Sequence, residues 1–442
     1  MKQIVLTIGL AAMATASPVL ARDGSFLIHG ARVFDGTKML GARDVLVMNG
    51  RIAKVAGRLA APQGMEIING RGRTLIPGLI DGHVHVFPGA QADALRFGVT
   101  TVFDMYAIAD KRTIDGWRAQ RVKNTRVAEA DTWTAGIGAT PPGGHPTELF
   151  KDMPAGMTLP ATLAPDADAD AFMKARVDAG SDYIKVLQDD GARPGRAGKL
   201  PNFTPQRFAT VLKAAKAIGK LVVVHVQQLA DARVAVANGA DALEHVVCDA
   251  PLDDTLISEM KMKGVAQTAT LATYDGLGGS DDARRLAADP AITRYLSATQ
   301  LGMLNLVWKR PRAADFAMAL ANTSRLARSG VVMIAGTDAP NPTTAFGPSL
   351  HLELTLLVRA GLTPTEALVA ATSAPARFFG TADRGRIAPG MKADLVLLAG
   401  DPAKDITATR RIVTIWKNGY AVDRAPPVDA PRRDNPNVEP PH

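Results

Sequence analysis

Two histidines near the start of the chain carry the clearest chemical signal. The segment 75–85 is apolar and ends in the triplet His83-Val84-His85. Residues two apart on a β-strand point to the same face, so both imidazoles can reach one metal ion. Pro-Gly pairs at 77–78 and 88–89 bracket the segment. The histidines are therefore expected where a strand leaves its sheet, which is where barrel enzymes assemble their active sites.

Further potential ligands stand at the ends of later apolar segments. Lys185 lies late in 183–187, His225 ends 221–225, His245 closes 242–245 and Asp338 follows 331–337. Each has an ordinary reading: a solvated lysine, a core histidine, or an aspartate that caps a helix. The chain has only eight histidines, and four of them fall at such ends. Because the C-terminal ends of parallel barrel strands meet at one mouth, the set together favours a metal centre.

The elements that position these residues follow an alternating pattern. Short β-branched runs alternate with Ala-rich helical stretches between residues 77 and 381, with strands expected at 79–86, 100–104, 126–130, 183–187, 221–225, 242–246, 265–271 and 331–337. Eight such units predict an α/β fold, a (β/α)8 TIM barrel. The alternative, an open doubly wound sheet, lacks a Gly-x-Gly-x-x-Gly segment after an early strand.

The two ends of the chain differ from this central region. Segments 22–76 and 382–423 contain short strands separated by Asn-Gly and Asp-Gly turns, which predicts one small β-sandwich domain built from both ends. Residues 424–442 are rich in Pro, Asp and Arg and are expected to be a disordered tail. Residues 1–21 have the layout of a secretory signal peptide with cleavage after Ala21. The mature protein is therefore expected in the periplasm or outside the cell.

Composition narrows the choice of partners. The net charge is +8, but the basic residues look scattered and are not interleaved with aromatic ones, which argues against nucleic acid as a partner. No further stretch reaches transmembrane length, so no membrane partner is expected after signal removal. Cys248 is the single cysteine, which excludes an intrachain disulfide, and we expect a buried thiol there.

Three features together resemble the amidohydrolase superfamily of metal-dependent hydrolases, over nearly the whole mature chain. They are the PGLID-x-H-x-H segment, the PG-x-x-ADLV segment at 389–396 and the order of the strand-end residues. The resemblance implies two divalent metal ions, with zinc the best guess and manganese, cobalt or iron as alternatives. It assigns the more buried ion to His83, His85 and Asp338, the more exposed ion to His225 and His245, and the bridge between them to Lys185 carboxylated by CO2.

The resemblance also implies a mechanism. A hydroxide that bridges the two ions attacks a carbonyl, and Asp338 acts as general base and then as general acid. His145, in the Gly-rich loop 140–148, is a candidate substrate contact, although the loop also reads as a simple turn. Tyr274 and Asp275 are expected to line the mouth unless they occupy an ordinary loop. Gln227 stands where many relatives carry the tyrosine of a His-Ala-Tyr motif, and it is the third candidate substrate contact.

The expected substrate is a small molecule. The lysine bridge and the Gly-Gly-His loop are most similar to the prolidase, Xaa-Arg dipeptidase and ochratoxin-hydrolysing group, with imidazolonepropionase more distant. This implies cleavage of an amide (peptide-like, N-acyl amino acid or xenobiotic) that bears a carboxylate, although Gln227 weakens the dipeptidase reading. Lactones, carbamates and organophosphate esters are alternative substrates. A metal-free, non-catalytic scaffold is disfavoured because all six ligand types are present. The leaving group, the metal and the oligomeric state, a homo-oligomer included, stay open.

Overall fold

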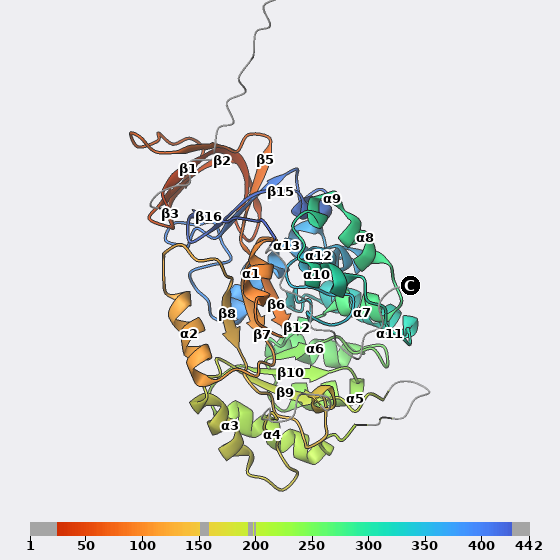
Figure 1. Cartoon of the computed structure of the whole chain (residues 1–442). Helices are drawn as coiled ribbons and strands as arrows, with labels where there is room; N and C mark the ends of the chain where they lie inside the picture. Colours follow the sequence, from red (N-terminus) through yellow and green to blue (C-terminus); the bar gives the residue numbers. More distant parts are fainter. Residues whose placement is uncertain (1–23, 151–158, 193–197, 199, 427–442) are drawn as a thin grey trace, which may run out of the picture.

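A computed structural model describes residues 24–150, 159–192, 198 and 200–426 (Figure 1). The predicted signal peptide and residues 427–442 of the predicted tail lie outside the described residues. Arg424, which the sequence placed in the tail, is buried and donates hydrogen bonds to the carbonyls of Arg96 and Ile412. Its guanidinium also lies 3.6 Å from the ring centroid of Tyr295. The folded part therefore extends past the predicted boundary at 424.

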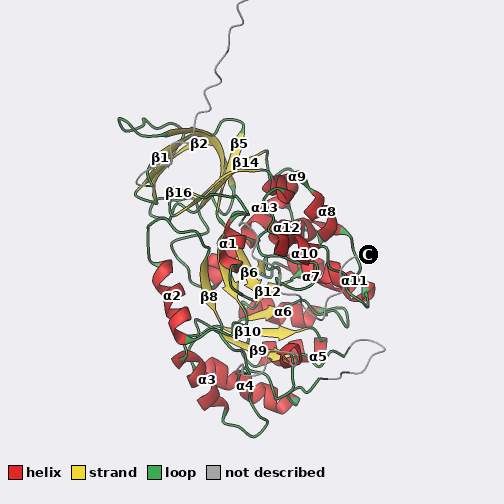
Figure 2. Cartoon of the chain, in the orientation of Figure 1, coloured by secondary structure: helices red, strands yellow, loops and turns green. Residues whose placement is uncertain are grey.

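Eight parallel strands form the centre of the molecule (Figure 2). They are β6 (Leu79–Val84), β7 (Val99–Asp104), β8 (Asp131–Thr134), β9 (Ile184–Gln188), β10 (Val222–Val226), β11 (Ala242–Glu244), β12 (Ala266–Thr268) and β13 (Met333–Ile334). Strands β6–β8 and β9–β13 are hydrogen-bonded in sequence order. Parallel bridges join the two groups at both edges, Ala139 with Val186 and Val84 with Ala339. The strands thus close into the predicted barrel.

Helices cover the outside of the barrel. They are α1 (Ala90–Leu95), α2 (Lys111–Arg121), α3 (Ala169–Asp178), α4 (Pro205–Ala217), α5 (Leu229–Ala237), α6 (Asp254–Lys263), α7 (Leu271–Leu277), α8 (Asp282–Ala288), α9 (Pro290–Thr293), α10 (Ala298–Leu304), α11 (Ala313–Ser329), α12 (Pro348–Arg359), α13 (Pro364–Ala370) and α14 (Ser373–Phe378), with 3-10 turns η1 (Thr147–Phe150) and η2 (Ile406–Arg410). Local chemistry sets their ends. The Thr204 hydroxyl caps α4 ahead of a proline, and Gly264 ends α6 in the left-handed conformation.

One predicted strand is misplaced. The sequence suggested 126–130, whereas β8 spans Asp131–Thr134, and Thr101 of β7 pairs with Asp131. The sequence pattern did not reveal β8 because the strand begins with a charged residue, Asp131. That side chain is fully buried, since Lys417 and Arg384 donate hydrogen bonds to it. The other seven expected strands overlap the observed ones. All five residues of the Val-rich strand β10 are buried, because the sheet is covered on both faces.

The two ends of the chain build one small mixed sheet. Its strands are β1 (Phe26–Phe34), β2 (Met39–Met48), β3 (Arg51–Ala56), β4 (Ile67–Asn69), β5 (Arg73–Pro77), β14 (Leu395–Ala399), β15 (Ile412–Lys417) and β16 (Tyr420–Ala421). The order is β16-β15-β14-β5-β1-β2-β3, with β4 beside β1. The sheet curves around its own core, in which Phe26 stacks on Trp416 (Figure 1). The predicted small β domain from both ends is confirmed.

No helix within the described parts of the chain combines the length and the apolar character that crossing a bilayer requires.

Candidate metal centre

Main-chain hydrogen bonds bring three of the predicted ligands together. The amide of Asp338 donates to the carbonyl of His83, and the amide of His85 donates to the carbonyl of Ala339, both at 2.8 Å. The segment after β13 is thereby fixed to the end of β6. Asp338 Oδ1 lies 3.0 Å from His85 Nε2 and 3.3 Å from His83 Nε2. Ligand atoms of all three residues lie within 4.8 Å of one another, which is compatible with one cation between them.

The other two predicted histidines continue the cluster. The ring centroids of His83 and His245 are 4.8 Å apart, and those of His245 and His225 are 4.3 Å apart. His245 Nδ1 also lies 3.9 Å from Asp338 Oδ2. His245 and Asp338 have φ values of +64° and +58°. Left-handed backbone is unfavourable for non-glycine residues, and such residues concentrate at functional sites.

Lys185 projects from β9 into the same centre. It is 2% exposed, and its Nζ has no hydrogen-bond partner among the described residues. Burial lowers the pKa of Lys185 to about 8, against the raising effect of the Glu244 and Asp338 carboxylates. A buried amine without a partner is costly, so its position calls for a compensating group. Four imidazoles, a carboxylate and this lysine supply the nitrogen and oxygen donors that suit divalent transition metals.

The pKa shifts of His225, His245 and Asp338 favour metal ligation. Burial lowers the pKa of His225 to about 3 and that of His245 well below its usual value. Burial alone would raise the pKa of Asp338, but the imidazoles of His245, His83 and His85 outweigh it and hold that pKa well below the usual range. Neutral imidazoles and an ionised carboxylate are the forms that bind metals.

Two acidic residues that the sequence reading missed support the cluster. Glu244 is fully buried, its Oε2 lies 2.5 Å from His83 Nδ1, and its Oε1 accepts from the Thr268 hydroxyl at 3.3 Å. Asp189 Oδ2 lies 3.4 Å from His225 Nε2. A glutamate inside a short buried strand, directly before His245, was the signal available for the first. Asp189 gave none, because it follows β9 by a single residue in a polar run.

The predicted substrate contact His145 does reach the site. Its ring centroid is 5.0 Å from that of His225, and its side chain is 29% exposed, so it lies at the rim. His145 Nδ1 is 2.6 Å from Glu148 Oε1. Gln227 is half-buried, and its side-chain oxygen accepts from the Cys248 thiol at 3.9 Å. Cys248 is buried, as predicted.

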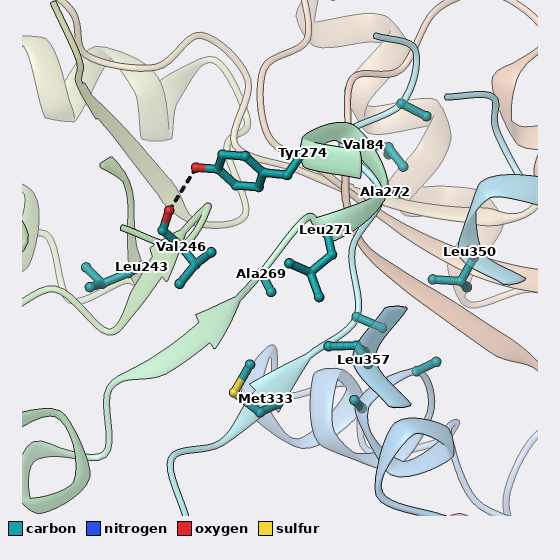
Figure 3. Packing of buried hydrophobic residues seen from close by; sticks show 14 of the residues in the cluster. Val84, Leu243, Val246, Ala269, Leu271, Ala272, Tyr274, Met333, Leu350 and Leu357 are labelled. Atoms are coloured by element: carbon teal, nitrogen blue, oxygen red, sulfur yellow. Dashed lines mark hydrogen bonds between the residues drawn. The ribbon is translucent and has the colours of Figure 1, made fainter. Parts of the chain in front are cut away.

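Tyr274 and Asp275 do not line the mouth as expected. Tyr274 is 2% exposed, and its hydroxyl donates to the Val246 carbonyl at 2.8 Å (Figure 3). Figure 3 shows its ring among buried side chains such as Val246 and Leu271. Asp275 is also fully buried. The reason is local: α7 begins at Leu271, three residues after β12 ends, and turns both residues into the core.

The closed barrel and the cluster at its mouth define a metal-dependent hydrolase class. Residues 74–422 match the family model for the amidohydrolase family, and the chain belongs to this family, whose enzymes hydrolyse carbon–nitrogen bonds. The imidazolonepropionase of Anaeromyxobacter sp. (strain K) is 27% identical over 412 residues, 83% of this chain and 85% of that protein. The dihydroorotase of Streptococcus thermophilus (strain CNRZ 1066) is 26% identical over 414 residues, which cover 86% of this chain and 92% of that protein. A solved Xaa-Pro dipeptidase with bound methionine superposes with a TM-score of 0.71 at 21% identity, covering 90% of this chain and all of that one.

Proposed function

We propose that the chain is a binuclear metal-dependent hydrolase that cleaves the carbon–nitrogen bond of a small amide. One observation carries the proposal: six potential ligands, which come from five barrel strands or from the turns directly after them, gather in one buried cluster. The names of the curated relatives, imidazolonepropionase and dihydroorotase, are compatible with chemistry at a carbon–nitrogen bond. Peptide-like amides, N-acyl amino acids and xenobiotic amides are the substrates to examine first.

The cluster divides into two candidate ion sites. His83, His85 and Asp338 would hold one cation, and His225 and His245 would hold the other. Lys185, carboxylated by CO2, would bridge them: its buried amine, which has no hydrogen-bond partner among the described residues, would become an anionic carbamate whose charge the two cations balance. Zinc fits this mixture of nitrogen and oxygen donors best. When bound, such a pair of cations lowers the pKa of water and polarises the substrate carbonyl.

The chain's own residues handle the proton and the substrate. Asp338 is ionised and lies at the centre of the cluster, so its carboxylate can accept a proton from the attacking water and return it to the leaving nitrogen. His145 lies at the rim beside His225. Burial alone would lower the pKa of His145, but the hydrogen bond and the charge of Glu148 outweigh it and raise that pKa. A protonated His145 suits a substrate carboxylate or a developing oxyanion.

Metal reconstitution tests the proposal directly. The purified full chain is stripped with a chelator, reloaded with zinc and bicarbonate, and assayed on N-acyl amino acids, dipeptides and aryl amides. We expect two zinc ions per chain and amide hydrolysis that depends on both zinc and bicarbonate. Lys185→Ala is expected to lose metal and activity together, while Lys213→Ala, an exposed lysine on α4, retains both. A chain that binds no metal after reloading, or that cleaves only lactones or esters, would overturn the proposal.

We also propose that the protein is exported. The support is the basic residue followed by an apolar run and a small-residue cleavage pattern within residues 1–21. N-terminal sequencing of protein from the periplasmic fraction should read from Arg22. Recovery of the uncleaved chain from the cytoplasm alone would contradict this.

A further inference from the structure

The positive charge of the chain is concentrated in one part of the fold. Between residues 78 and 381 the sequence has thirty-one basic and thirty-one acidic residues, so the barrel is neutral. Between residues 24 and 77, which form β1–β5, it has eight basic residues and three acidic ones. The basic residues that looked scattered along the sequence are thus segregated by domain.

Solvent exposure sharpens this asymmetry. All eight basic side chains of β1–β5 and their loops reach the surface: Lys38, Arg51, Lys54, Arg58 and Arg71 are exposed, and Arg32, Arg43 and Arg73 are half-buried. Two of the three acids, Asp35 and Asp44, are buried. The Asp44 carboxylate accepts hydrogen bonds from the amides of Gly30 and Leu59, and the Asp35 carboxylate accepts one from the Thr37 hydroxyl. Within residues 24–77 only Glu66 remains as an exposed acid, although Arg32 also lies 3.8 Å from Asp401, which follows β14. We call the eight cations the basic face.

The basic face lies away from the metal centre. Strand β5 connects to the N-terminal end of β6, whereas His83 lies at the C-terminal end of β6. Figure 1 shows the curved sheet at one end of the molecule, beyond the barrel strands. The first described residue, Gly24, belongs to this sheet region, because its carbonyl accepts from the amide of Gly50.

We propose that the basic face docks the protein on anionic phospholipid headgroups while the barrel mouth faces solvent. The cations are spread over several strands and loops, which suits a surface of many phosphates. Two exposed apolar side chains of the same sheet, Met48 and Ile67, are available to enter the interface. A single-stranded nucleic acid would be expected to meet aromatic stacking platforms. The proposal is independent of the amide chemistry. It differs from the expectation of no membrane partner, because that expectation considered the net charge of the whole chain and not the charge of each domain.

Vesicle flotation of the full mature chain tests the proposal. We expect binding to vesicles that contain phosphatidylglycerol and none to pure phosphatidylcholine. Binding should disappear in about 0.5 M salt, because screening then acts within a few ångströms. Each cation near such a surface contributes roughly a fivefold change in partition. The triple variant Arg51→Gln, Lys54→Gln, Arg58→Gln should therefore bind about 100-fold more weakly.

A matched control separates the surface from net charge. Arg112→Gln, Lys213→Gln and Arg310→Gln remove the same residue types from exposed barrel positions, and binding should be retained. Both triple variants should keep the zinc content and thermal midpoint of the parent, since none of these side chains lies in the metal centre. The proposal is overturned if anionic vesicles do not bind, if the control variant weakens binding equally, or if heparin or DNA binds more tightly than the vesicles.

Discussion

Glu244 offers the sharpest test of how the barrel prepares its metal centre. Its carboxylate lies 2.5 Å from His83 Nδ1, and neither side chain is exposed to solvent. A carboxylate can only accept, so the proton must sit on His83 Nδ1, which leaves Nε2 free to bind a cation. Glu244 is therefore a positioning residue that acts through His83.

The magnitude follows from what each substitution removes. Glu244→Gln retains an acceptor of similar volume but loses the charge, and charge-assisted hydrogen bonds are roughly twice as strong as neutral ones. A loss of about 1.4 kcal/mol corresponds to about tenfold weaker zinc binding. Glu244→Ala leaves the buried His83 Nδ1–H without its acceptor and frees the ring to rotate, for a total cost of about 1–3 kcal/mol. Losing such a partner typically costs 10–100-fold in metal affinity.

Competition with a chromophoric zinc chelator measures these affinities without any substrate. The expected order is wild type, then Glu244→Gln, then Glu244→Ala. Glu353→Gln is the matched control, because Glu353 is equally buried but hydrogen-bonds the Ala272 amide instead of a predicted ligand. Zinc affinity of the alanine variant within twofold of wild type, or an equal loss in the control, would refute the reasoning.

Three further outcomes are expected. Burial raises the pKa of Glu353 to about 8 from 4.5, so the unfolded chain releases this proton at lower pH than the folded chain does. In urea titrations, wild type should therefore lose up to about 1.4 kcal/mol of stability per pH unit between pH 4.5 and 8, relative to Glu353→Gln. Asp131→Ala should cost about 3–5 kcal/mol in the same titrations, because it strands buried cations such as Lys417, while Asp115→Ala at an exposed ion pair should cost less than about 1 kcal/mol. Tyr274→Phe should cost about 1 kcal/mol and leave turnover unchanged; a large loss of turnover would restore Tyr274 to the mouth.

The clustering of the candidate ligands could be predicted because it depends on local pattern and parallel topology alone. An apolar run that ends in a histidine fixes both the strand and the end of the barrel at which the side chain lies. The same reasoning failed for β8, whose charged first residue Asp131 is buried only because Lys417 and Arg384, far along the chain, surround it. No local pattern reveals such a partner.

The substrate contacts show the opposite limit. All three candidate contacts follow barrel strands, yet their side chains lie in different places. His145 lies at the rim, the Gln227 side chain contacts the Cys248 thiol, and Tyr274 lies in the core. A residue beyond a strand end points wherever the next turn directs it. Tyr274 turns inward because α7 begins three residues after β12 ends, and its hydroxyl donates to the Val246 carbonyl. Sequence order therefore predicts the ligands on strands better than the contacts on loops.

The main-chain contacts that close the barrel between β13 and β6 also bring Asp338 to the histidines of the centre. The amide of Gly82 donates to the Ala335 carbonyl, and the Asp338 amide donates to the His83 carbonyl. These bonds join the segment around β13 to β6, and they also set the distance from Asp338 to the imidazoles. Gly336 permits this approach, because a Cβ there would lie 2.7 Å from the Cβ of His83. Since these contacts are made only when both segments are in register, the ligand geometry is held by backbone hydrogen bonds and does not depend on side-chain packing alone.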